Sequence, residues 1–126
     1  VRVVSPAKFT KSSDRLKERG VQVSHCPPND EEAFRTFVRE VTSTQSLDIV
    51  VYDRFVMEEM FGWQVRKLLP SALNILDTQD LHFLRKHRGL NSASTGEIAL
   101  DVPSIPADCS FVSRELAAIH RSDVVW

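Results

Sequence analysis

The chain has 126 residues, of which 42% are hydrophobic and 26% charged, and its formal net charge is −1. This composition is typical of a globular protein, and the length is enough for one domain with a real core but not for two. The near-neutral charge predicts no general attraction to nucleic acid, and no apolar run approaches the roughly 20 residues of a membrane span.

Short apolar runs alternate along the chain with helical patterns. The runs lie at residues 1–4, 21–24, 47–52, 73–76 and 124–126. The third and fourth are mainly aliphatic and lead directly into Asp53 and Asp77, as expected of parallel strands buried on both faces. Repeated strand–helix–strand units predict right-handed crossovers. The fold class is therefore α/β, a Rossmann-like parallel sheet of about five strands with flanking helices.

Helices are predicted between these runs, at 13–19, from about 29, at 56–69, from about 81 and at 110–121. Gly20 is a typical residue for ending the first helix, and Asn29 with Glu32 fits a capping box that opens the second. Pro70 closes the third. In the last helix Val112, Leu116 and Ile119 are expected to face inward.

Residues 89–108 interrupt the alternation with Gly, Ser, Ala, Asn and Pro, and are predicted to form a long loop. Apolar runs stand at both ends of the sequence without caps. We therefore expect residues 1–126 to be a single, partial Rossmann-like domain. The two cysteines, Cys26 and Cys109, are too few for a disulfide framework and are interpreted as buried small residues, which favours a reducing compartment.

Polar side chains follow the strands at 47–52 and 73–76, and ligands of open parallel sheets bind beyond the carboxyl ends of strands. The candidate site residues are Asp53, Arg54, Asp77, Asp80, His82 and Arg85. We expect the three acids and the histidine to cluster at this edge, with one acid bonded to backbone N–H groups of the following turn and with the arginines as counter-ions.

Several polar residues of these segments also have a purely structural interpretation. Asp80 is a possible N-cap, Arg85 is a possible member of a solvated helix face, and Glu58 and Glu59 are suited to a helix dipole. The sequence contains no G-x-G-x-x-G, no P-loop, no G-x-S-x-G and no Cys/His metal spacing. We therefore predict no metal and no cofactor bound by this chain itself.

Three segments carry a family resemblance. Residues 48–63 read D-I-V-V-Y-D-R-F-V-M-E-E-M-F-G-W, residues 72–88 read A-L-N-I-L-D-T-Q-D-L-H-F-L-R-K-H-R, and residues 114–123 read R-E-L-A-A-I-H-R-S-D. They resemble the patterns D-R-F-x-x-E-E-x-F-G-W, I-L-D-T-x-D-L-H-x-L-R and R-E-x-A-x-I-x-R-x-D of the amino-terminal, acceptor-side domain of GT-B-type glycosyltransferases of the large retaining group 1 family. The resemblance covers roughly residues 15–126.

The resemblance implies a fragment of the acceptor-binding half of a nucleotide-sugar-dependent glycosyltransferase, inactive alone. The nucleotide sugar would bind a second, donor-binding domain that this sequence lacks, as it lacks the family's first strand with its glycine-rich turn. Two alternatives stay open. One is a non-catalytic, glycosyltransferase-like structural subunit of a larger assembly, in which partner chains complete the sheet. The other is a free-standing ligand-binding module of flavodoxin type, disfavoured by the missing phosphate loop.

Overall fold

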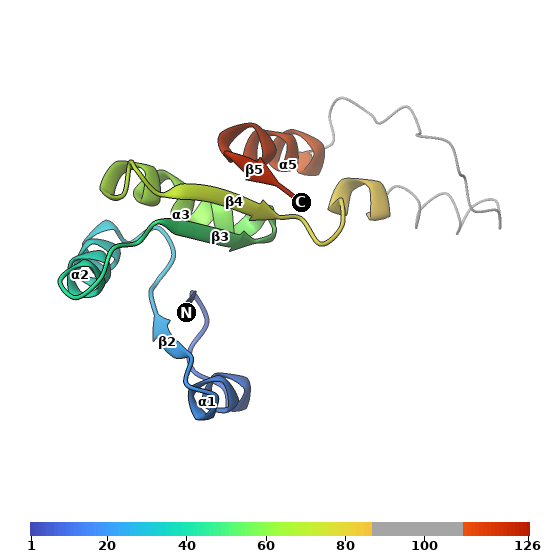
Figure 1. Cartoon of the computed structure of the whole chain (residues 1–126). Helices are drawn as coiled ribbons and strands as arrows, with labels where there is room; N and C mark the ends of the chain where they lie inside the picture. The colour runs from blue at the N-terminus through green and yellow to red at the C-terminus, as the bar shows by residue number, and fades with distance from the viewer. Residues whose placement is uncertain (87–109) are drawn as a thin grey trace. The chain divides into compact units, whose positions relative to one another are not determined.

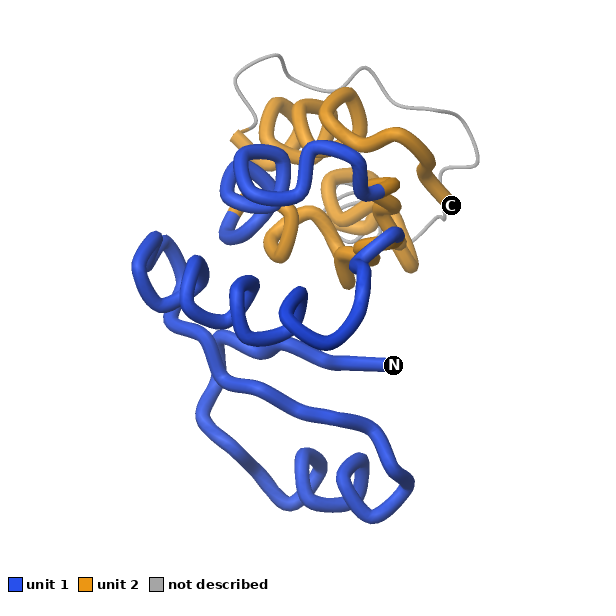
Figure 2. Tube along the Cα trace, turned by 60° about the vertical axis from the view of Figure 1, so that its left-hand side comes forward, with its two compact units in different colours: residues 1–48, 60–72 blue, residues 49–59, 73–126 orange. Residues whose placement is uncertain are grey.

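The structure is a computed structural model that describes residues 1–86 and 110–126 (Figure 1). The loop expected at 89–108, and Cys109, lie outside the described residues. The chain divides into two compact units (Figure 2). Unit 1 comprises Val1–Asp48 and Met60–Ala72, and unit 2 comprises Ile49–Glu59 and Leu73–Trp126. Helix α3 (Arg54–Leu68) supplies its first six residues to unit 2 and the remainder to unit 1.

Unit 1 opens with a strand–helix–strand motif. Strands β1 (Arg2–Ser5) and β2 (Gln22–His25) pair in parallel, with α1 (Lys11–Glu18) between them in the sequence. Gly20 has φ +79°, and its N–H donates to the carbonyl of Lys17. The left-handed residue reverses the chain after the helix, as predicted for Gly20.

Helix α2 (Glu31–Thr42) begins one residue later than the sequence predicted. Asp30 is its N-cap, with extended backbone and with Oδ1 accepting a hydrogen bond of 2.9 Å from the Ala33 N–H. The capping role predicted for Asn29 was wrong. Asn29 has φ +57°, whereas a capping residue needs extended backbone to turn its side chain back onto the helix.

The core of unit 1 lies between α2 and the second half of α3. Phe34, Val38 and Val41 are buried on α2, at the i, i+4, i+7 spacing of one helix face. The Phe34 ring stacks on Phe61 of α3 with 5.7 Å between ring centroids. Val65 of α3 is buried as well. Unit 1 is therefore held mainly by apolar side chains.

Unit 2 is built on three parallel strands in the order β3-β4-β5. They are β3 (Ile49–Asp53), β4 (Leu73–Asp77) and β5 (Val124–Val125), and the register places Asp53 opposite Asp77. The expectation that the apolar runs at 47–52 and 73–76 are parallel neighbours is confirmed. Helix α5 (Ser110–Arg121) precedes β5, and a helical turn at 82–86 follows β4.

The predicted single sheet of about five strands is not what the described residues form. They form two parallel sheets, one of two strands and one of three. The alternation of strands and helices predicts the elements and their direction, but pairing between strands depends on long-range packing. Strand β3 also differs from the expectation of burial on both faces, because Ile49 is 57% and Val51 51% exposed. Only the central strand, β4, buries consecutive side chains, Asn74, Ile75 and Leu76.

Of the three α5 residues predicted to face inward, Val112 and Ile119 are half-buried, but the prediction for Leu116 was wrong. Leu116 is 43% exposed, whereas Glu115 and Ala118 are buried. Glu115 is therefore buried in place of Leu116, and charged contacts hold this helix, as described below. Among the described helices, none has the length and apolar character needed to cross a membrane.

Candidate functional site

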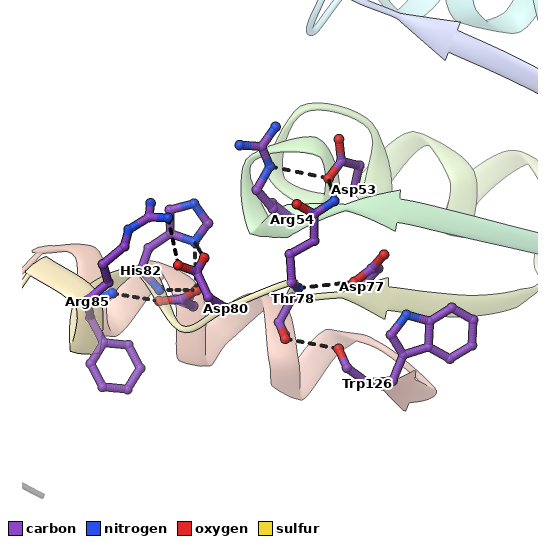
Figure 3. Close-up of polar contacts among 11 residues, drawn as sticks. Asp53, Arg54, Asp77, Thr78, Asp80, His82, Arg85 and Trp126 are labelled. Carbon is purple, nitrogen blue, oxygen red and sulfur yellow. Dashed lines mark hydrogen bonds and ion pairs between the residues drawn. The ribbon is translucent and has the colours of Figure 1, made fainter. Parts of the chain in front are cut away.

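The carboxyl ends of β3 and β4 meet at one edge of the three-stranded sheet, here called the rim (Figure 3). Asp53 and Asp77 are the last residues of the two strands and are register partners. The Asp53 side chain is 57% exposed. The rim therefore presents neighbouring carboxylates where ligands of parallel sheets commonly bind.

Gln79 bridges the two aspartates, a role that the sequence did not predict. Its Nε2 donates to Asp53 Oδ1 at 2.8 Å, and its backbone N–H donates to Asp77 Oδ1 at 3.0 Å. The second bond is an Asx turn, which meets the expectation that one acid accepts from the following turn. Gln79 has φ +55°, an uncommon backbone conformation for a residue that is not glycine. The sequence signal for this turn is the Asp-x-Gln spacing directly after a predicted strand.

Arg54 places its guanidinium next to the Asp53 carboxylate. Its Nε lies 3.2 Å from Asp53 Oδ1, and its side chain is 48% exposed. Arg54 has φ +67°, so the backbone between β3 and α3 adopts a conformation costing of order 1–2 kcal/mol for a residue with a Cβ atom. Strain of this kind persists only where the surrounding structure enforces it and is frequent at functional sites.

The turn after β4 carries the other predicted residues. Asp80 Oδ2 accepts a bond of 2.6 Å from Arg85 Nη1, and Asp80 Oδ1 lies 3.5 Å from His82 Nδ1. Both Thr78 donors, N–H and Oγ1–H, bind the carbonyl of Trp126 at 2.9 Å, which anchors this turn to the chain beyond β5. The structure thus brings all six predicted residues to one edge of unit 2, in two groups joined by the turn at 77–80.

Glu115 of α5 is a second residue whose role the sequence did not predict. Its carboxylate is 2% exposed and accepts from the backbone N–H groups of His82 and Phe83, both at 3.1 Å. These are the first N–H groups of the helical turn at 82–86, so the capping role considered for Asp80 belongs to Glu115. Leu116 belongs to the predicted aliphatic stripe and Glu115 does not, so the sequence gave no signal that Glu115 is buried.

Two ion pairs fix α5 against the start of α3. Glu58, with a fully buried side chain, receives Nε and Nη2 of Arg121, and Glu59 receives Nε and Nη2 of Arg114. The hydrogen bonds that Arg121 donates to Glu58 raise the pKa of Arg121 above its ordinary value, against the opposing effect of burial. The helix-dipole interpretation of Glu58 and Glu59 was wrong, because α3 begins at Arg54 and neither glutamate lies in its first turn.

The described residues contain no group of three or more His, Cys, Asp or Glu side chains placed to hold a metal ion. The rim instead offers hydrogen-bond acceptors on Asp53, Asp77 and Asp80 and donors on Arg54 and Arg85. No family model, no curated protein and no solved structure matches the chain. The family resemblance therefore rests on the motif residues themselves.

Proposed function

We propose that this chain is part of the acceptor-binding half of a nucleotide-sugar-dependent glycosyltransferase, and that its rim binds the hydroxyl groups of the acceptor. The observation that carries the proposal is the in-register pair Asp53 and Asp77 at the carboxyl ends of adjacent parallel strands. That position is the usual ligand site of open α/β sheets. The rim residues also belong to the two motif segments that resemble the acceptor-side domain.

The charges of the rim favour a hydroxyl-rich ligand over an anion. The carboxylates of Asp53 and Asp80 already hold the guanidiniums of Arg54 and Arg85, and Asp77 adds a further negative charge. An anionic ligand would meet this excess of carboxylate, whereas hydroxyl groups donate to carboxylate oxygens and accept from guanidinium N–H groups. A neutral sugar or another polyol fits the set of donors and acceptors best.

In this proposal the chain contributes binding and orientation. Placing an acceptor hydroxyl next to a donor sugar lowers the barrier by proximity, and the nucleotide sugar would be held by a separate donor-binding domain. We therefore expect the 126-residue chain to bind an acceptor weakly and to show no transfer from any nucleotide sugar.

The test is saturation-transfer NMR of the purified chain with a panel of methyl hexosides. We expect at least one hexoside to bind, with a Kd on the order of 1 mM, because isolated sugar sites rely on a few hydrogen bonds. Asp53→Ala should abolish the signal. Asp48→Ala is the matched control, since Asp48 immediately precedes β3 at its opposite end. Absence of binding across the panel, or equal loss in the two variants, would refute the proposal. So would transfer by the chain alone.

The alternative, a structural subunit, is favoured by one specific observation. Strand β3 ends the three-stranded sheet and exposes Ile49 and Val51. An apolar edge strand is suited to pairing with a strand of another chain. If the strand that pairs with β3 comes from a second copy of the chain, Val51→Lys should abolish self-association measured by sedimentation, whereas Val125→Lys on β5 should not.

A further inference from the structure

The carboxylate of Glu115 is buried in a way that calls for an explanation beyond helix capping. It accepts from three N–H groups, the two backbone groups of residues 82 and 83 and the ring Nδ1 of His82 at 3.3 Å. Burying a carboxylate is costly unless it is fully hydrogen-bonded, and here each oxygen has a donor. Two of the three donors belong to His82, so Glu115 fixes both the backbone and the ring of that residue.

The surroundings of His82 Nδ1 determine which ring nitrogen carries the proton. Nδ1 faces two carboxylate oxygens, Glu115 Oε1 at 3.3 Å and Asp80 Oδ1 at 3.5 Å. A carboxylate only accepts, so Nδ1 must be the N–H group. In the neutral ring Nε2 is then the unprotonated nitrogen, a hydrogen-bond acceptor. Phe55 packs edge-to-face with the imidazole at 5.4 Å and limits its rotation.

Of the two carboxylates, Glu115 is the better fixed. The Asp80 side chain is 38% exposed, so solvent competes for its oxygens. Its Oδ2 binds Arg85 at 2.6 Å, and its Oδ1 lies farther from the ring of His82 than the Glu115 oxygen does. Glu115 is 2% exposed and is anchored by two backbone N–H groups. A carboxylate held by backbone donors in a dry environment orients an imidazole as the partners of catalytic and metal-bound histidines do.

We propose that Glu115 is a positioning residue: it holds His82 in the tautomer protonated on Nδ1, so that Nε2 accepts a hydrogen bond from one hydroxyl of the ligand at the rim. The assignment of the ligand rests on the proposed function above. The tautomer is a property of the free chain and does not depend on it. His82 is in turn the residue that would touch the ligand, and it is 16% exposed in the free chain.

The experiment is long-range ¹H–¹⁵N NMR of the ¹⁵N-labelled chain at an alkaline pH at which the imidazole is neutral. His82→Ala assigns the signal among the four histidines. We expect Nδ1 at the position of a protonated nitrogen and Nε2 at that of an unprotonated one. Glu115→Gln keeps the shape but adds an N–H donor, so the population should shift toward the Nε2–H tautomer. Asp80→Asn is the matched control and should leave the tautomer unchanged.

Three outcomes would overturn the inference: a wild-type His82 protonated on Nε2, a folded Glu115→Gln variant that keeps the wild-type tautomer, or loss of the tautomer in Asp80→Asn alone. If Glu115→Gln does not fold, the wild-type spectrum still decides. With a bound methyl hexoside, Glu115→Gln should weaken affinity about fivefold, the effect of one lost hydrogen bond. Failure of every hexoside to bind, with the Nδ1–H tautomer in place, would contradict the proposed acceptor function and support the positioning by Glu115.

Discussion

The two halves of helix α3 pack by different means. Its first residues, in unit 2, carry Glu58 and Glu59, which are bound to the arginines of α5. Its later residues, in unit 1, carry Phe61 and Val65, which are buried with the apolar face of α2. Apolar packing tolerates small shifts of one helix on another, whereas bidentate ion pairs fix direction as well as distance.

This difference shows that the orientation of a helix is fixed by specific polar contacts in unit 2. In unit 2, buried Glu58 and Glu115 are each tied to a specific partner, and α5 carries one member of both contacts. Buried charge is an inefficient way to gain stability, because desolvation offsets much of the attraction. Its advantage here is a defined orientation of α5, and α5 in turn holds the rim through His82.

The largest effect is expected in unit 1. Phe34→Ala removes a buried ring that stacks on Phe61, and should lower the free energy of unfolding by about 3–5 kcal/mol. Unfolding of unit 1 in urea is measured by the fluorescence of Trp63, in a chain in which Trp126 is replaced by Phe. Phe37→Ala, at a half-buried position on the same helix, is the control and should cost clearly less. Equal losses would contradict an apolar core centred on Phe34.

A smaller effect is expected from the ion pairs of unit 2. Arg121→Leu removes the charge-assisted hydrogen bonds to the fully buried Glu58 carboxylate and should cost about 2–3 kcal/mol, because Arg121 itself is 39% exposed. Arg114→Leu leaves only the part-exposed Glu59 and should cost about 1 kcal/mol or less. Unfolding of unit 2 in both variants is measured by the fluorescence of Trp126, in a chain in which Trp63 is replaced by Phe. A loss for Arg114→Leu as large as that for Arg121→Leu would show that burial does not distinguish the two pairs.

The smallest effect concerns the surface pair of unit 1. The hydrogen bonds from Lys67 and then Arg35 lower the pKa of Glu31 below its ordinary value of 4.5. A lowered folded-state pKa means that the contribution to stability is present above pH 4.5 and is lost as the pH falls through the folded value. Lys67→Met should therefore be slightly less stable than wild type at neutral pH and equally stable in acid. A difference that persists in acid would contradict the assignment.

The sequence predicted the elements and the rim more accurately than the pairing of strands or the face of α5. Apolar runs identified β3 and β4, and the residues that end neighbouring parallel strands emerge at one edge of the sheet, so the placement of Asp53 and Asp77 was accessible to local reasoning. The separation into two sheets was not, because it depends on contacts between distant segments. Leu116 was expected inside on periodicity alone.

Glu115 shows the limit of that reasoning most clearly. A periodic pattern assigns a glutamate to the solvent, and only the geometry of the helical turn at 82–86, which presents two N–H groups, accounts for its burial. The same applies to Gln79, whose bridging of the two aspartates depends on the left-handed backbone of the turn. The partners of Glu115 are distant in the sequence, so spacing does not reveal them. For Gln79, the Asp-x-Gln spacing indicates the turn onto Asp77 but not the contact with Asp53 on the neighbouring strand.

Binding of a hydroxyl-rich ligand at the rim is tested by the amide chemical-shift map of the ¹⁵N-labelled chain with a bound methyl hexoside. We expect the shifts to concentrate at residues 53–54 and 77–86, at the rim of unit 2, and to disappear in Asp53→Ala. Shifts confined to β1 and β2, or a binding response that leaves the rim amides unchanged, would contradict it.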